Sequence, residues 1–321
     1  MNKPFVVPVN PDSACKPPSA KDFLVDRTFR ALARVGVVLI LAVVFALVFE
    51  VGHKALPGME KHGLDVLFGS VWDVNQGKYG ILPAIWGTLY SALIALMIAG
   101  FFGVSMAIFL TQDFLPAQLA AVFRTIVELL AAIPSVVYGL WGIYVVIPAI
   151  RPLTTWLHTE LGWIPFFGTS LSGPGLLPAA LVLAIMILPT IAAVSQDALT
   201  AVPMKTKQAA YGMGTTHWEA ILKVMVPSAA TGIFGSLVLG LGRALGETMA
   251  LAMLVGNANN ISLSLFAPAN TLAALLALNF PEAGPSEIEV LMYAALVLMF
   301  ITLVVNVIGS MIMVYAQRGN K

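Results

Sequence analysis

Long apolar runs dominate this sequence and decide what it can fold into. A helix rises 1.5 Å per residue, so about 20 apolar residues are needed to cross the roughly 30 Å hydrocarbon core of a membrane. None of the runs alternates apolar and polar residues as the strands of a membrane barrel do. We therefore predict an all-α integral membrane protein with six transmembrane helices. The predicted spans cover residues 31–51, 83–110, 122–147, 176–194, 229–255 and 290–316.

The composition supports this fold class and excludes others. Of the 321 residues, 59% are hydrophobic and 10% are charged, whereas a soluble domain has about 45–50% apolar and about 25% charged residues. Mean hydropathy is +0.90. The net charge of +1 gives no reason to expect disorder or nucleic-acid binding. The single cysteine, Cys15, excludes a disulfide scaffold.

The predicted spans divide the chain into a tail, a first helix and a transport domain. Residues 1–30 are polar, carry no early apolar segment of the kind found in signal peptides, and are predicted to form a cytoplasmic tail whose end, from about Lys21, is an interfacial helix. Residues 31–51 are the first span, and residues 83–316 form the transport domain. Twelve of the 17 Lys and Arg residues fall on the side of the termini and four on the other side. This bias predicts that both termini are cytoplasmic.

The sequence lacks the common signatures of catalysis. It contains no phosphate-binding P-loop, and its four histidines have no metal-ligand spacing. No paired carboxylates lie together within a span. We therefore expect neither a catalytic site nor a metal or cofactor in this chain.

The loop between the fourth and fifth spans, residues 203–227, is the most informative segment. Glycines 212 and 214 are expected to end a first short helix, and Thr216 with Glu219 matches a capping box that starts a second one. The result is a helix-turn-helix that either binds a partner or lies on lipid headgroups. Helical spacing predicts one apolar face on it, formed by Trp218, Ile221, Leu222 and Met225.

The same loop resembles a known motif. Gln208-Ala209-Ala210, three residues, Gly214, nine residues and Val224 to Pro227 are similar to the EAA loop of ABC importer permeases, which contacts the ATPase. Gln208 stands where that motif has Glu. The resemblance implies the type-1 permease fold and a coupling role for Gln208, Ala209, Ala210, Gly214, Val224 and Pro227.

Three further stretches narrow the family. Residues 127–142, 183–193 and 240–250 resemble the third-, fourth- and fifth-span signatures of phosphate importer permeases, and the best match is the PstC-type subunit. This implies a bacterial inner-membrane protein that assembles with a PstA-like second permease, a PstB-like ATPase dimer that hydrolyses the ATP, and a PstS-like periplasmic binding protein. The alternatives are a PstA-type permease or a permease for another oxyanion. A secondary transporter is disfavoured because no inverted repeat is found.

Two charged residues lie inside the fifth span. Arginine at a span centre costs about 2.5–3.5 kcal/mol on insertion scales, and Glu247 follows Arg243 by one turn, so we expect the two to form an ion pair. The pair is either structural or part of an anion site, since guanidinium matches phosphate oxygens. The resemblance favours the anion site. Gly242 and Gly246 are expected to let another helix approach.

The third span supplies the other pathway candidates. Glu128 either faces the substrate pathway or extends to the membrane surface, and Ser135 and Tyr138 either bind an oxyanion or pack between helices. Pro134 and Pro189 each remove a backbone hydrogen bond within a span, and both are predicted to kink their helices.

Overall fold

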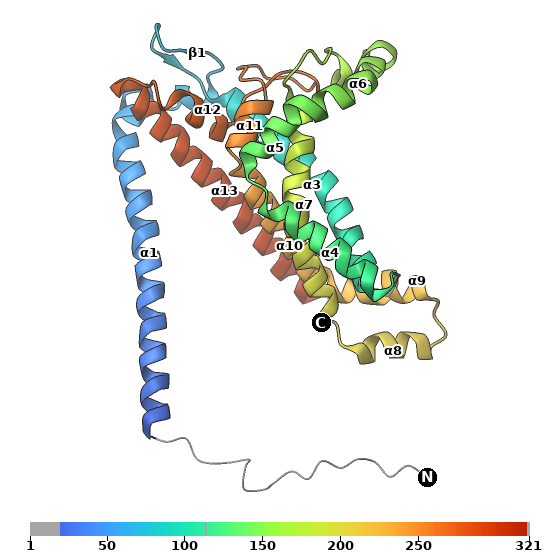
Figure 1. Ribbon diagram of the computed structural model, residues 1–321. Helices are drawn as coiled ribbons and strands as arrows, with labels where there is room; N and C mark the ends of the chain where they lie inside the picture. The colour runs from blue at the N-terminus through green and yellow to red at the C-terminus, as the bar shows by residue number, and fades with distance from the viewer. Residues whose placement is uncertain (1–19, 113, 320–321) are drawn as a thin grey trace, which may run out of the picture. The chain divides into compact units, whose positions relative to one another are not determined.

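The structure, a computed structural model, describes residues 20–112 and 114–319 and is almost entirely helical (Figure 1). It contains as many candidate spans as predicted, though several bounds differ. The helical segments that are long and apolar enough to cross a membrane are Phe23–His62, Leu82–Thr111, Ser135–Leu161, Leu176–Thr200, His217–Leu245 and Pro285–Tyr315.

The chain divides after His53 into two units. The first unit holds most of α1 (Ala20–His62), which begins well before the predicted first span at residue 31. The side chains that the structure describes in residues 21–50 are exposed, as expected for a helix whose surroundings are lipid. Asp26 and Arg30 form an ion pair of 2.6 Å near its start. The predicted tail lies outside the described residues up to position 19.

The second unit, from Lys54 on, contains the other elements. They are α2 (Asp65–Phe68), β1 (Trp72–Asp73), β2 (Lys78–Tyr79), α3 (Leu82–Thr111), α4 (Ala117–Ala132), α5 (Ser135–Trp141), a π-helical turn (Gly142–Val146), α6 (Ile147–Leu161), a 3-10 turn (Pro165–Phe167), α7 (Leu176–Thr200), α8 (Met204–Gly212), α9 (His217–Ala220), a second π-helical turn (Ile221–Met225), α10 (Val226–Leu245), α11 (Met249–Leu254), α12 (Leu272–Asn279) and α13 (Pro285–Gly319). The two strands form an antiparallel hairpin, with Trp72 opposite Tyr79.

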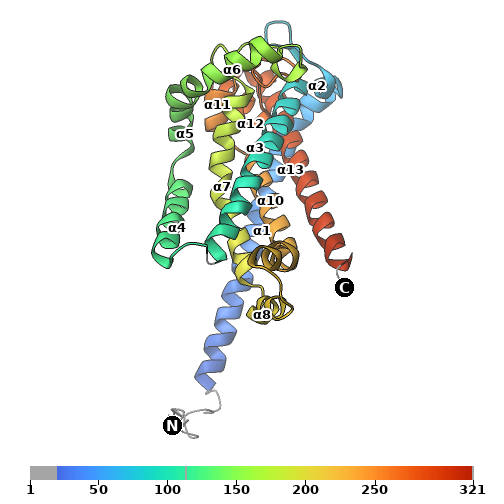
Figure 2. The ribbon, with the colours of Figure 1, turned by 90° about the vertical axis from the view of Figure 1, so that its right-hand side faces the viewer.

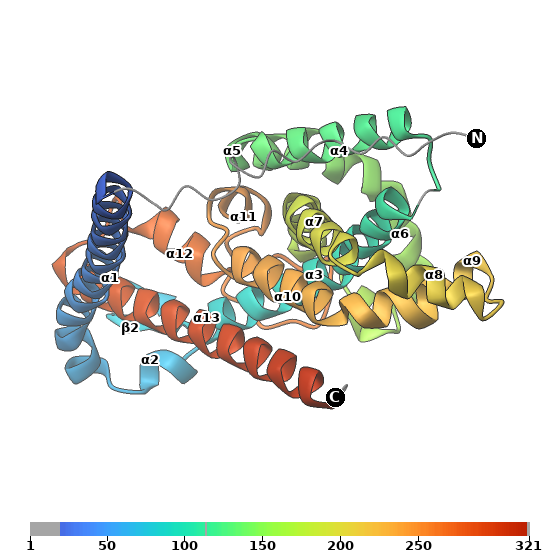
Figure 3. The same cartoon turned by 90° about the horizontal axis from the view of Figure 1, so that it is seen from below.

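The long helices of this unit run between two distinct ends. In Figure 1, α8 and α9 lie at one end, called here the α8 end, and α6, α11, α12 and the hairpin lie at the other, called here the hairpin end. Figure 3 shows α7 at the centre, with α3 and α10 on one side of it and α4 and α5 on the other. The core follows this arrangement, because α7 packs most extensively against α3 and α10.

Small residues allow these three helices to pack closely around Ile191. A Cβ added to Gly103 of α3 would lie 3.0 Å from Ile191 Cγ2, and one added to Gly240 of α10 would lie 2.7 Å from Ile191 Cγ1. Ile191 is fully buried between them. One turn further along α7, the hydroxyls of Ser195 and Ser236 are 2.8 Å apart and link α7 to α10. Close packing and interhelical hydrogen bonds hold helices together where lipid removes the hydrophobic driving force.

Two of the predicted spans are broken, which corrects the single helices expected at 122–147 and 229–255. In the third, α4 ends at Ala132, and Ile133 and Pro134 are extended, with ψ of 128° and 143°. Proline disfavours helical geometry at the preceding residue and supplies no N–H. In the fifth, α10 ends at Leu245 and α11 starts at Met249. Pro189, by contrast, lies within α7, which continues through it.

The packing around Ile191 gives a testable prediction. Gly240→Ala places a methyl group against Ile191, and overpacking of this kind costs about 1–3 kcal/mol. We expect a lower melting temperature of the detergent-purified protein. Gly235→Ala on the same helix is the matched control, because its nearest neighbour, Met313, would be 3.8 Å away. Equal melting temperatures for the two variants would contradict the role of the glycine.

Candidate functional site

The helix-turn-helix predicted at residues 203–227 is present at the α8 end. Gly214 has a φ of +82°, the left-handed conformation that favours glycine, and it turns the chain between α8 and α9. Gly212, in contrast, is the last residue of α8, so the break lies mainly at Gly214. The Thr216 backbone N–H donates to Glu219 Oε2 at 3.1 Å, and Thr216 Oγ1 accepts from the Glu219 N–H at 3.4 Å. These two bonds confirm the capping box.

The apolar face predicted on this loop is divided between two sides. Ile221 and Met225 are buried, at 0% and 4% exposure, whereas Trp218 and Leu222 are 57% and 56% exposed. The buried pair fixes the segment to the bundle, and the exposed pair faces outward. Gln208, Ala209 and Pro227 are also exposed, Val224 is half-buried and Ala210 is buried. The structure therefore provides an outward apolar surface, to which Met204 and Met213 also contribute.

An aromatic cluster that the sequence did not reveal anchors the loop to the end of α3. His217 Nε2 lies 3.1 Å from the Gln112 carbonyl oxygen, and its Nδ1 lies 2.7 Å from the Tyr211 hydroxyl. Because a carbonyl can only accept, Nε2 carries the proton, and Nδ1 can accept from Tyr211. Phe114 packs on the rings of His217 and Trp218, with ring centroids 5.0 and 5.1 Å apart. The loop is therefore attached at a point about 100 residues away in the sequence.

The break at Pro134 is compensated by a side chain. The Leu130 carbonyl would accept from residue 134 in a continuous helix, but proline has no N–H. The Tyr138 hydroxyl instead donates to Leu130 O at 2.8 Å (the α4–α5 junction is visible in Figure 2). Tyr138 is buried at 5% exposure, and Ser135 occupies the first turn of α5. A broken helix is tolerated in a membrane where such a group replaces the lost partner.

The ion pair predicted between Arg243 and Glu247 is not formed among the described residues. Arg243 Nη1 donates to Thr190 Oγ1 of α7 at 3.0 Å. Glu247 Oε1 instead accepts from the Ala250 N–H at 3.4 Å, in the first turn of α11. The prediction was wrong because it assumed a continuous helix, and α10 ends at Leu245. Arg243 therefore lies in α10 and Glu247 in the segment between α10 and α11, and the two residues have separate partners.

The guanidinium of Arg243 is exposed in the described chain. Helix α11, which follows α10 after the break, packs on α5, where a Cβ added to Gly139 would lie 2.7 Å from Met253 Sδ. Of the two glycines predicted to allow helix approach, Gly242 does so: an added Cβ would be 3.2 Å from Asn306 Oδ1 of α13. Gly246, beyond the helix end, is exposed and meets no neighbouring helix in the described residues. An arginine with a neutral partner leaves a positive charge available to an anion.

A second arginine of this kind was not singled out from the sequence. With the Gln196 amide oriented so that its oxygen faces the guanidinium, that oxygen accepts from Arg124 Nε at 3.0 Å and from Nη2 at 2.5 Å. This contact joins α4 to α7. Glu128, one turn beyond Arg124 on α4, is exposed, and the described residues show no ion pair between the two.

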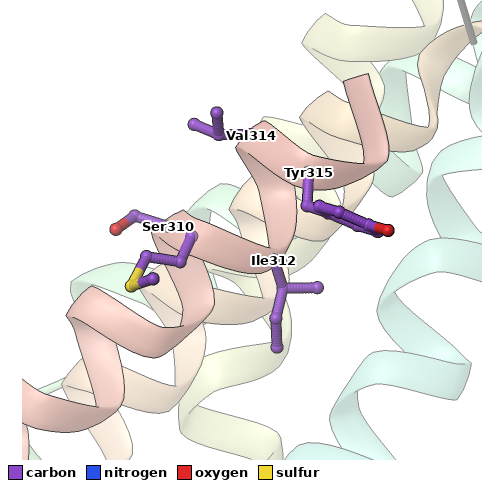
Figure 4. Close-up of a pocket in the computed structure, with 5 residues that line it drawn as sticks. Ser310, Ile312, Val314 and Tyr315 are labelled. Carbon is purple, nitrogen blue, oxygen red and sulfur yellow. The ribbon is translucent and has the colours of Figure 1, made fainter. Parts of the chain in front are cut away.

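The described chain also has hollows that are not lined by Arg243 or Arg124. Two pockets of about 360 and 530 Å³ share Lys61, His62 and Tyr79 near the hairpin. Burial raises the pKa of Tyr79, and the nearby Glu287 carboxylate raises it further. Figure 4 shows residues that line another hollow; its volume is about 530 Å³, and its lining residues in the described part of the chain belong to α13. Its mostly apolar lining, Ser310, Met311, Ile312, Val314 and Tyr315, suits lipid rather than an anion.

Known proteins that are similar to this chain in sequence or in fold are components of membrane transport systems. Residues 101–321 match the family described as binding-protein-dependent transport system inner membrane component. The phosphate transport system permease protein PstC of Xylella fastidiosa is 35% identical over 93% of this chain and 93% of that protein. The PstC protein of Pasteurella multocida is 37% identical over 92% and 93%. A solved bacterial alginate ABC transporter has a similar fold, with a TM-score of 0.61 at 15% identity over 90% of this chain and 94% of that chain.

The bond between Tyr138 and Leu130 can be tested by removing one hydroxyl. Tyr138→Phe removes the shorter of two bonds to the Leu130 carbonyl, which keeps the 3.4 Å bond from the Ile133 N–H; losing one such hydrogen bond costs about 0.5–1.5 kcal/mol. We expect a lower melting temperature in detergent. Tyr144→Phe is the control, because Tyr144 is 75% exposed. If both variants melt like the parent protein, the hydroxyl does not support the break.

Proposed function

Because the chain belongs to the family of binding-protein-dependent transport system inner membrane components, we propose that it is the permease subunit of an ATP-driven importer of inorganic phosphate. The observation that carries this proposal is the similarity to PstC permeases along nearly the whole chain, at 35% and 37% identity. The solved relatives add only the fold, which is that of ABC importer permeases.

The proposed assembly follows from the importer class. Such an importer needs an ATPase and a substrate-binding protein, and we propose a PstB-like ATPase dimer and a PstS-like periplasmic protein for these roles. A PstA-like second permease completes the translocation path. ATP is hydrolysed on the ATPase, since this chain has no P-loop. This chain supplies no catalytic group of its own.

The proposed orientation places both termini and the α8 end in the cytoplasm of a bacterial cell. Support comes from the bias of Lys and Arg toward the loops on that side. The hairpin end then faces the periplasm, where the binding protein delivers its phosphate. With this orientation, the loop of residues 203–227 lies on the same side of the membrane as ATP.

We assign coupling to this loop. Its exposed apolar side chains, among them Met213 at 77% and Trp218 at 57% exposure, form a surface suited to a protein partner. Gln208, which is exposed beside it, offers an amide where the EAA motif offers a carboxylate. The bonds of His217 to Gln112 and Tyr211 fix the loop to α3. Movement of a bound ATPase is therefore passed to the transmembrane helices.

We assign substrate binding to the region around Arg243. Its guanidinium is held by a neutral hydroxyl, Thr190 Oγ1, so its charge remains available for an oxyanion, and phosphate can take two parallel bonds from it. Tyr138 and Ser135 border the region from α5, and Glu128 lies on α4. Glu247, bonded to the start of α11, positions the helix break rather than neutralising the arginine.

The coupling role predicts the effect of a turn variant. Gly214→Val places a β-branched residue at a φ of +82°, which costs roughly 1–3 kcal/mol for residues other than glycine. The turn should distort, and less ATPase should co-purify with the permease in mild detergent, although membrane insertion stays normal. Gly212→Ala is the control, because an added Cβ there meets no atom within 4 Å. Wild-type amounts of bound ATPase in Gly214→Val would refute the coupling role.

The substrate role predicts which property of Arg243 matters. Arg243→Lys keeps the charge but loses the planar fork, so we expect phosphate uptake to fall at least tenfold with normal abundance. Thr190→Val removes the anchor alone and should reduce uptake less. The measurement is labelled-phosphate uptake per membrane-inserted permease, in cells without other phosphate importers. Full uptake by Arg243→Gln would rule out this arginine as the binding residue, and absence of phosphate uptake by the wild-type assembly would overturn the proposed function.

A further inference from the structure

Helix α4 is mostly exposed in the described chain and packs mainly against α7. Of its side chains that the structure describes, only Val127 is buried. At one end it connects to α5 through the extended residues Ile133 and Pro134. The Tyr138 hydroxyl holds its last turn through Leu130 O. Near its middle, the Arg124 guanidinium holds it to Gln196 of α7.

The partner of Arg124 is a neutral amide although carboxylates are close in sequence. Asp197 follows Gln196 on α7, and Glu128 follows Arg124 by one turn on α4, and both are exposed. Among the described residues neither forms an ion pair with Arg124. A carboxylate would hold a guanidinium with charge-assisted bonds about twice as strong as neutral ones. The observed contact is the weaker one, so a stronger acceptor can displace it.

The remaining donors of Arg124 are suited to an oxyanion. Guanidinium has five N–H donors, and Gln196 Oε1 accepts from Nε and Nη2 only. The residue is exposed, so its other donors are accessible. A phosphate group presents several negatively charged oxygens to the same fork, whereas the amide presents one neutral oxygen.

The contact between Arg124 and Gln196 lies on the same helix as the residue that holds Arg243. Thr190, which holds Arg243, and Gln196, which holds Arg124, are both on α7. Six residues separate them, which corresponds to about 9 Å along a helix. Gln196 is the closer of the two to Thr200, where α7 ends at the α8 end. The second arginine is therefore held nearer the α8 end, the proposed cytoplasmic side, than Arg243 is.

We propose that Arg124 is a second binding residue for a phosphate-type oxyanion, and that its bond to Gln196 is a latch which the anion opens. This inference rests on the proposed function, because it takes the substrate to be phosphate leaving Arg243 toward the α8 end. When the anion reaches Arg124, it replaces the Gln196 oxygen. Helix α4 is then released from α7 and turns about Ile133 and Pro134, which widens the exit.

The test uses the complete importer reconstituted in proteoliposomes, with labelled-phosphate uptake normalised to assembled complex. Gln196→Glu separates the latch from a simple brace, because a permanent ion pair strengthens a brace but closes a latch. We expect Gln196→Glu and Arg124→Gln each to reduce uptake at least tenfold. Thr125→Ala is the control, because the Thr125 hydroxyl donates to Ala121 O of its own helix, and it should remain within twofold of wild type.

A distance measurement identifies the source of the phosphate group. Spin labels at Leu119 of α4 and Thr200 of α7, with Cys15 replaced by serine, report the separation of the two helices. Inorganic phosphate, added in vesicles of unchanged lipid composition, should lengthen this distance in the Arg124 protein and leave it unchanged in Gln196→Glu. A distance that does not respond to inorganic phosphate in either protein would overturn the proposal.

The outcomes separate this inference from the proposed function. If the wild-type complex takes up no phosphate, the proposed function fails. If the wild type transports and Gln196→Glu transports equally fast, only the latch fails, and the contact of Arg124 with Gln196 is a structural brace.

Discussion

Every backbone carbonyl and N–H group inside a membrane must find a partner within the protein, and this requirement shapes the two places where helices break. A continuous helix satisfies it automatically, whereas Pro134 and the segment after Leu245 do not. The first break is satisfied by the Tyr138 hydroxyl, and the second by Glu247, which accepts from the first turn of α11. Helices α5 and α11, which follow the two breaks, pack against each other, so the irregular backbone lies near the substrate site proposed around Arg243.

The two arginines Arg243 and Arg124 must also find hydrogen-bond partners within the protein. A guanidinium in a span must be hydrogen-bonded, but a carboxylate partner would remove its affinity for an anion. Arg243 and Arg124 are instead held by the neutral side chains of Thr190 and Gln196, both on α7. The central helix thus orients two positive charges without neutralising them. The mechanism proposed for phosphate depends on this choice of partner.

Local chemistry in the sequence was sufficient to predict several features. The number of candidate spans, the helix break at Gly214 and the capping box of Thr216 and Glu219 each depend on a few neighbouring residues, and all are present. The expected pair of Arg243 and Glu247 failed because it needed a continuous helix, and a glycine at 246 was the available sign that the helix ends. The contacts of Tyr138, Arg124 and His217 with other segments depend on tertiary structure, so no spacing rule could reveal them.

The packing of Ile191 between Gly103 and Gly240 has a consequence for how such a molecule can move. Because even a methyl group at either glycine would collide with Ile191, the helices have little room to slide, and we expect α3, α7 and α10 to move as a single rigid block during transport. Alternation between inward- and outward-open states must then be absorbed at the hinges outside this block, at residues 133–134 and 246–248. Substitutions among the packed residues of α3, α7 and α10 should therefore alter the stability of the protein. Substitutions at residues 133–134 and 246–248 should instead alter its transport rate.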